Sequence, residues 1–151
     1  MALFKLIHLL TVLIWVGGMF FAYMVLRPAA AEILESPLRL SLWQAALRRF
    51  FKWVWSAVAA LLISGFYMIY LLGGMPHVPV YVHVMLALGL AMTAIYCYVF
   101  FACYVSLSLN VANQRWKEAG EALDKIRKLV ALNLTLGILT VCVAVLGRAW
   151  A

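Results

Sequence analysis

The chain has 151 residues, of which 68% are hydrophobic and 11% are charged, and its mean hydropathy is +1.05. A soluble domain is about half apolar and about a quarter charged, so this composition excludes a soluble globular protein and indicates an integral membrane protein. The net charge of +7 does not indicate nucleic-acid binding, because the basic residues lie between hydrophobic segments, where they act as topology determinants. The three cysteines lie inside hydrophobic segments without CxxC spacing, which argues against a disulfide framework.

Four hydrophobic segments are long enough to cross a bilayer, which takes about 20 residues per helix. The first is expected to stop at Arg27-Pro28, since the residue before a proline is disfavoured in a helix. The second ends at Gly73-Gly74, a helix-stop signal, and the third begins near Pro79. The predicted spans are about 3–26, 53–72, 79–109 and 126–146. We therefore expect one all-α transmembrane domain over 1–151, folded as an up-down-up-down four-helix bundle.

The two longer connections are also predicted to be helical. Residues 36–52 are expected to form a short amphipathic helix along the membrane surface. Residues 114–129 are charged, with Glu121/Lys125 and Asp124/Lys128 spaced i,i+4, and should extend the fourth helix into water.

The loop charges predict the orientation. Residues 27–52 and 110–128 each hold five Lys or Arg, whereas residues 73–78 hold none. The positive-inside rule places both basic segments in the cytoplasm. This orientation leaves both termini and residues 73–78 outside the cell membrane.

Two histidines lie at matching positions in the first and third spans. His8 is near the start of the first helix and His83 is about four residues into the third. In the predicted bundle these helices are parallel and diagonal, so the imidazoles fall at similar depth across a gap of roughly 11–14 Å. A six-coordinate haem takes two axial ligands, and histidine is a usual one. We predict that His8 and His83 ligate the iron of one haem b.

Other residues fit this haem hypothesis. Gly17 and Gly18 would let a flat macrocycle approach the first helix, and Lys5 and Arg148 are candidates to bind the propionates. Each has a simpler explanation: the glycines pack helices, the two cations snorkel to the interface, and each histidine hydrogen-bonds a neighbouring helix.

Copper is the alternative cofactor. Thioether and thiolate ligands suit Cu(I), and the hydrophobic segments contain several methionines and three cysteines, but no CxxC, MxxM or HxxH cluster. Scattered Met and Cys usually serve packing. No carboxylate lies inside a span, so a proton- or cation-coupled transporter would lack its usual acid.

The sequence also resembles a known family. The segments LIHLLTVLIWVGGMFF, RPAA, SGFYMIY and YVHVMLALGL are similar to the CopD-type membrane domain, usually described as a copper transport or export protein. More distantly, they resemble HemJ-type protoporphyrinogen oxidases, four-helix haem-binding proteins of the inner membrane. In both families the first-helix histidine corresponds to His8. Many members have lysine where this chain has His83, and the methionine- and histidine-rich outer segments of a dedicated copper exporter are absent here.

The sequence and this resemblance thus predict a bacterial inner-membrane protein with both termini in the periplasm. It would be a haem b protein for electron transfer, or an oxidoreductase acting on a quinol, a porphyrinogen or a reactive oxygen species. Its partners would be the lipid bilayer and a quinol or redox partner, and dimerisation is left open. The first alternative is a CopD-type copper transport or resistance protein that uses His8 and methionines as ligands. The second is a non-catalytic membrane scaffold in which both histidines are structural.

Overall fold

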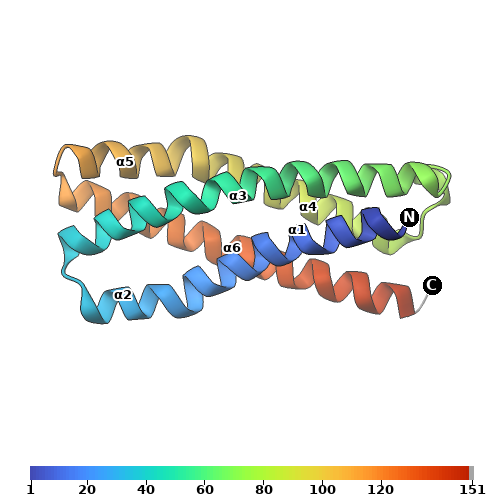
Figure 1. The fold of residues 1–151 in the computed structure, drawn as a ribbon, viewed down its shortest axis with the longest axis horizontal. Coiled ribbons are helices and arrows are strands. Elements are labelled where there is room, and N and C mark those ends of the chain that lie inside the picture. The colour runs from blue at the N-terminus through green and yellow to red at the C-terminus, as the bar shows by residue number, and fades with distance from the viewer. Residues whose placement is uncertain (150–151) are drawn as a thin grey trace.

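The computed structural model describes residues 1–149, and these residues form four long helical rods without a β-strand (Figure 1). Each rod is long and apolar enough to cross a membrane, so the predicted all-α membrane fold is confirmed. The first rod is α1 (Ala2–Phe20), the π-helical η1 (Phe21–Leu26) and α2 (Arg27–Ile33), and the second is α3 (Ser36–Leu71). After a short 3-10 turn, η2 (Met75–His77), the third rod is α4 (Val80–Tyr98), the π-helical η3 (Val99–Tyr104) and α5 (Val105–Ala112), and the fourth is α6 (Trp116–Ala149).

Successive rods run back and forth along the long axis of the molecule (Figure 1). The N-terminus, the C-terminal part of α6 and the α3–α4 connection lie together at one end, which we call the termini end. The α2–α3 and α5–α6 connections lie at the opposite end, which we call the charged end because all five acidic residues belong to its two connections or the adjoining helix turns.

The rods pack as two hairpins joined through α6. The first helix, α1, packs chiefly against α3, whereas α4 packs chiefly against α6, which also contacts α1 and α3. At Gly137 of α6 both hairpins approach closely, because an added Cβ would meet Val16 of α1 and Met92 of α4. A second junction is aromatic: Phe51 of α3 makes edge contacts with Tyr96, Phe100 and Tyr104.

The prediction that the first helix stops at Arg27-Pro28 is wrong. The helix continues through Pro28 to Ile33, by way of the π-helical turn η1. A proline inside an α-helix clashes with the carbonyl four residues earlier. Here the backbone N–H of Arg27 bonds to the carbonyl of Ala22, five residues back, and this wider turn accommodates the proline ring.

The prediction of a separate surface helix over 36–52 is also wrong, because these residues form the first half of α3. Leu40, Trp43, Leu47 and Phe51 recur at helical spacing and are all buried. The amphipathic pattern therefore reflects burial against the rest of the bundle instead of contact with the membrane surface. The predicted helical extension of the fourth span is confirmed, since α6 begins at Trp116 and is unbroken.

The two hairpins have the same order of helical elements, which was not predicted from the sequence. Each begins with an α-helix of 19 residues followed by a π-helical turn of six. Each then ends with one uninterrupted long helix, of 36 residues in α3 and 34 in α6. The η1 turn widens the first rod beside the cavity described below.

Candidate functional site

Three polar side chains are buried within the apolar part of the bundle: Thr11, Ser64 and Asn133. Polar groups inside a membrane span are costly and are functional candidates by default. The Thr11 hydroxyl donates to the carbonyl of His8 at 2.8 Å, and the Asn133 amide donates to the carbonyl of Met92 at 3.2 Å. Ser64 differs from both, because it contacts an imidazole.

The His8 imidazole of α1 packs half-buried against Ser64-Gly65 of α3. Its Nδ1 lies 3.0 Å from the Ser64 Oγ, and this hydroxyl donates to the carbonyl of Leu61 at 3.0 Å. A serine hydroxyl carries one proton, so when Ser64 donates that proton to Leu61 its oxygen accepts from the Nδ1–H of His8. Nε2 then keeps its lone pair, and this is the tautomer that binds a metal while the other ring nitrogen is held by a hydrogen bond.

The ring also lies against Gly65, since a Cβ built there would be in van der Waals contact with Cε1 of His8, at 3.4 Å. The His8 ring therefore contacts the hydroxyl oxygen of Ser64 and the backbone of Gly65. Ser64 is only 1% exposed, so its hydroxyl is shielded from water and is committed to His8 and Leu61.

The structure places His83 in a different environment from His8. The His83 side chain is exposed, and its Nδ1 lies 3.3 Å from the carbonyl of Pro79, one turn earlier in the chain. Among the described residues no hydrogen bond joins the two histidines, and no group of three or more His, Cys, Asp or Glu is placed to hold a metal. A haem held between His8 and His83 has no support in this geometry and stays a prediction.

The other four residues predicted to contact the haem also differ from one another in their surroundings. Gly18 packs against the ring of Phe50 on α3, so it serves helix packing, whereas Gly17 faces open space. Lys5 and Arg148 are exposed near the termini end, where an interfacial position suits them. Contact of these four residues with a haem stays a prediction.

Several residues with imidazole or thioether groups belong to the termini end. All three histidines belong to its helix ends and connection, together with Met68, Met75 and Met85. Met68 follows Ser64 by one helical turn, and therefore lies on the same face of α3. In contrast, Met19, Met92 and Cys103 are buried among core side chains farther along the bundle, where packing explains them.

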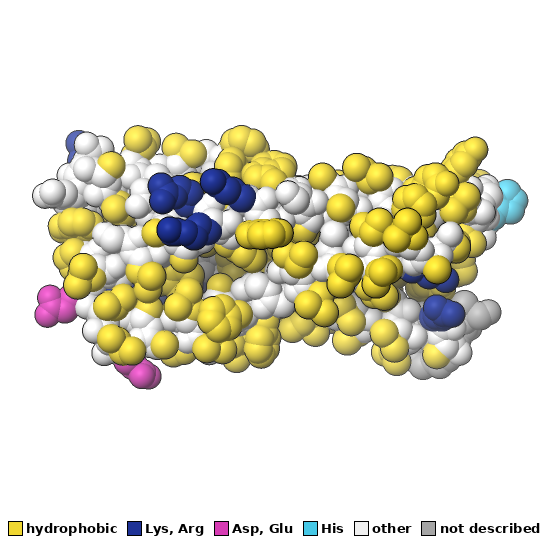
Figure 2. Space-filling model, in the orientation of Figure 1, with side chains coloured by type: hydrophobic (Ala, Val, Ile, Leu, Met, Phe, Trp, Pro, Cys, Tyr) yellow, Lys and Arg dark blue, Asp and Glu magenta, His cyan; other side chains and the backbone are white. Residues whose placement is uncertain are grey.

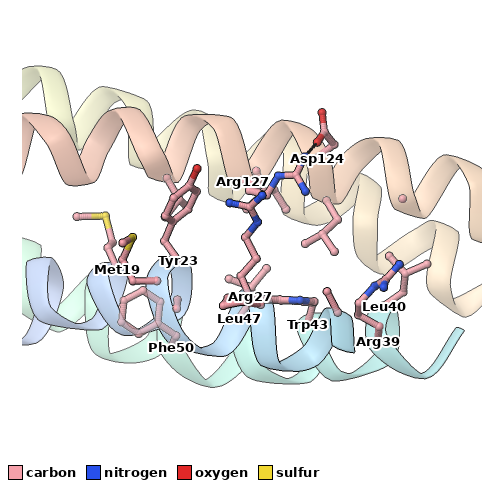
Figure 3. Close-up of a pocket in the computed structure, with 18 of the residues that line it drawn as sticks. Met19, Tyr23, Arg27, Arg39, Leu40, Trp43, Leu47, Phe50, Asp124 and Arg127 are labelled. Atoms are coloured by element: carbon pink, nitrogen blue, oxygen red, sulfur yellow. Dashed lines mark hydrogen bonds and ion pairs between the residues drawn. The ribbon is translucent and has the colours of Figure 1, made fainter. Parts of the chain in front are cut away.

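A cavity of about 730 Å³ opens at the charged end, between the first rod, α3 and α6 (Figure 3). Three arginines line it, Arg27, Arg39 and Arg127, with a single carboxylate, Asp124. The predicted i,i+4 pair of Asp124 and Lys128 is present at 2.8 Å, and Asp124 also pairs with Arg127. The predicted pair of Glu121 and Lys125 is replaced, since the Lys125 ammonium lies over the ring of Tyr98, 5.1 Å from its centroid.

Sequence reasoning missed Ser64 and the grouping of the arginines. Ser64 had a usable signal, since it is a polar residue within an apolar span. The arginines had none, because they are far apart in the sequence and only the packing of three rods brings them to one cavity.

Comparison with known families gives one match. A family model described as Copper resistance protein D (CopD) matches residues 44–146. The matched region runs from α3 to near the end of α6 and includes Ser64 and His83, but it begins after His8. No curated protein and no solved structure matches the chain. The matched region exceeds half of the chain, and together with four helices able to span a membrane it shows that this multi-pass membrane protein belongs to the CopD family.

Proposed function

We propose that the protein handles copper in the membrane, in transport or in copper resistance, and that His8 at the termini end binds the ion as Cu(I). The observation that carries this proposal is the hydrogen-bond chain from His8 Nδ1 through Ser64 to Leu61. This chain leaves Nε2 free to coordinate a metal. The match to the copper resistance family supports copper as the metal.

The donor atoms at this end suit Cu(I). Imidazole and thioether are ligands that this ion accepts, whereas Mg²⁺ and Ca²⁺ require carboxylates and carbonyls. Met68, on the same face of α3 as Ser64, is the first thioether we assign to the site, and Met75 of η2 and Met85 of α4 belong to the same end of the bundle. All five acidic residues belong to the other end of the bundle, so hard cations lack charged ligands here.

The side of the membrane at which His8 would meet copper follows from the proposed orientation. With the basic segments in the cytoplasm of a bacterium, the termini end faces the periplasm. The copper site would then lie about two turns inside the periplasmic entrance, since His8 follows the first residue of α1 by six positions. We accordingly assign His8 to the uptake or release of copper at the periplasmic side.

Metal analysis of the purified chain, combined with absorption spectra of the oxidised and dithionite-reduced protein, tests this proposal. Protein from cells supplied with both copper and haem is expected to retain copper and to show no Soret band. A Soret band with stoichiometric iron would overturn the proposal in favour of the haem hypothesis. Protein that carries neither metal, and gains no copper on reconstitution with Cu(I), would overturn it in favour of a scaffold.

A further inference from the structure

The cavity at the charged end lies where the predicted membrane boundary crosses the bundle. The charge-free stretches of three rods end at Arg27, Lys52 and Lys128, each about 20 residues from the termini end, which matches a hydrocarbon core of about 30 Å. The cavity extends to both sides of this level, from Met19 and Phe50 to Ser36 and Arg39. Its middle therefore lies at the depth of lipid headgroups.

The cavity carries an excess of positive charge at that depth. Arg27 and Arg127 project from opposite walls towards the same part of the cavity (Figure 3). Asp124 is shared between Arg127 and Lys128. Among the described residues, no carboxylate pairs with Arg27 or Arg39, and the Arg27 guanidinium lies over the ring of Tyr23, 4.9 Å from its centroid.

The walls on the membrane side of the arginines are apolar. Met19, Tyr23 and Phe50 lie together on one side of the arginine pair, and Arg39 lies on the other (Figure 3). Leu47 and Val130 continue the apolar lining. The cavity thus changes from apolar to cationic along its length, as a phospholipid changes from acyl chain to phosphate.

We propose that this cavity binds an anionic phospholipid, with the phosphate between Arg27 and Arg127 and one acyl chain along Met19, Tyr23 and Phe50. Guanidinium groups bind phosphate oxygens in a bidentate manner, and basic pockets between transmembrane helices accept anionic headgroups. A zwitterionic lipid is disfavoured because its ammonium group would lie among the arginines. Free phosphate would leave the apolar walls without a partner.

Thermal unfolding of the full chain in detergent, with native mass spectrometry of retained lipid, tests the proposal. Phosphatidylglycerol should raise the unfolding midpoint and stay bound, whereas phosphatidylcholine and inorganic phosphate should do neither. The double variant Arg27→Gln/Arg127→Gln should lose affinity for phosphatidylglycerol by roughly tenfold or more, since it removes both guanidinium groups that would bond the phosphate directly. The matched control Arg48→Gln/Arg49→Gln removes the same charge from exposed positions of α3 outside this cavity and should bind as wild type.

A third variant gives a change in the opposite direction. Asp124→Asn removes the only carboxylate that lines the cavity and releases Arg127, so it should bind phosphatidylglycerol more tightly than wild type. This result remains informative if the double variant does not fold. Equal losses in the two double variants, equal binding of phosphatidylcholine, or the full effect with inorganic phosphate alone would each overturn the proposal.

Discussion

Glycines in the helical rods have different surroundings, so replacing them by alanine is expected to affect stability differently. An added Cβ at Gly147 of α6 would meet the Cβ and Cγ atoms of Tyr81 on α4. The backbone fixes the position of the Tyr81 Cβ, so a change of side-chain rotamer cannot move this atom away. At Gly89 of α4 a Cβ would meet nothing within 4 Å. Of these two glycines, Gly147 is therefore the one at which helices approach closely.

Substitution of Gly147 by alanine is expected to destabilise the protein. Overpacking costs about 1–3 kcal/mol, more than the gain of up to about 1 kcal/mol from replacing glycine in a helix. Gly89→Ala is the matched control and should leave the thermal midpoint in detergent unchanged or slightly raised. Equal midpoints for the two variants would contradict the α4–α6 contact.

His8 shows what can be inferred from one residue in a sequence. Its polarity within an apolar span was enough to single it out. Its tautomer was not predictable, because the hydrogen-bond partner Ser64 lies 56 positions away in the chain. The pairing with His83 rested on matched depth alone, whereas the structure gives each imidazole a separate hydrogen-bond partner, Ser64 for His8 and Pro79 for His83.

At the scale of elements, hydrophobic runs located all four rods, because a membrane span requires about 20 apolar residues and little else. Local rules were less successful at Pro28 and over 36–52. The proline rule describes a regular α-helix, and the π-helical turn η1 removes the clash that the rule assumes. No property of FAYMVL in the sequence distinguishes it from an ordinary helical segment.

The charged segments of the second and fourth rods were identified from their composition. Composition does not show which parts of the protein these segments pack against. An amphipathic pattern indicates that one face is buried, but it does not say whether lipid or protein covers that face. In α3 the covering is protein, with Leu40 and Trp43 in the core. The same packing brings Arg39 to the cavity.

At the scale of the whole molecule, the bundle is longer than a bilayer is thick. A helix of 36 residues such as α3 measures about 54 Å, compared with a hydrocarbon core of about 30 Å. Hydrophobic side chains cover most of one face, while basic side chains gather over α3 and acidic ones lie at the charged end (Figure 2). The charged end is therefore expected to project into the cytoplasm.

Cysteine labelling tests this orientation. In a background with the three native cysteines replaced by alanine, Pro76→Cys lies at the termini end and Asn113→Cys at the charged end, both at exposed positions. A membrane-impermeant thiol reagent applied to intact cells should label position 76 only, and permeabilisation should expose position 113. The reverse pattern would contradict the positive-inside assignment and would place the arginine cavity in the outer leaflet.

The most direct test of the central claim is a competition titration of Cu(I) against a chromogenic chelator, with wild type and three variants. His8→Ala should abolish tight copper binding, and Ser64→Ala should weaken it by roughly tenfold to a hundredfold, because loss of a group that orients a ligand costs about this much. The control is His77→Ala, which should bind copper as wild type does. His77 is an exposed histidine of the same end, and its Nδ1 bonds to the carbonyl of Gly73. Unchanged affinity in a folded His8→Ala variant would contradict the assignment of His8 as the copper ligand.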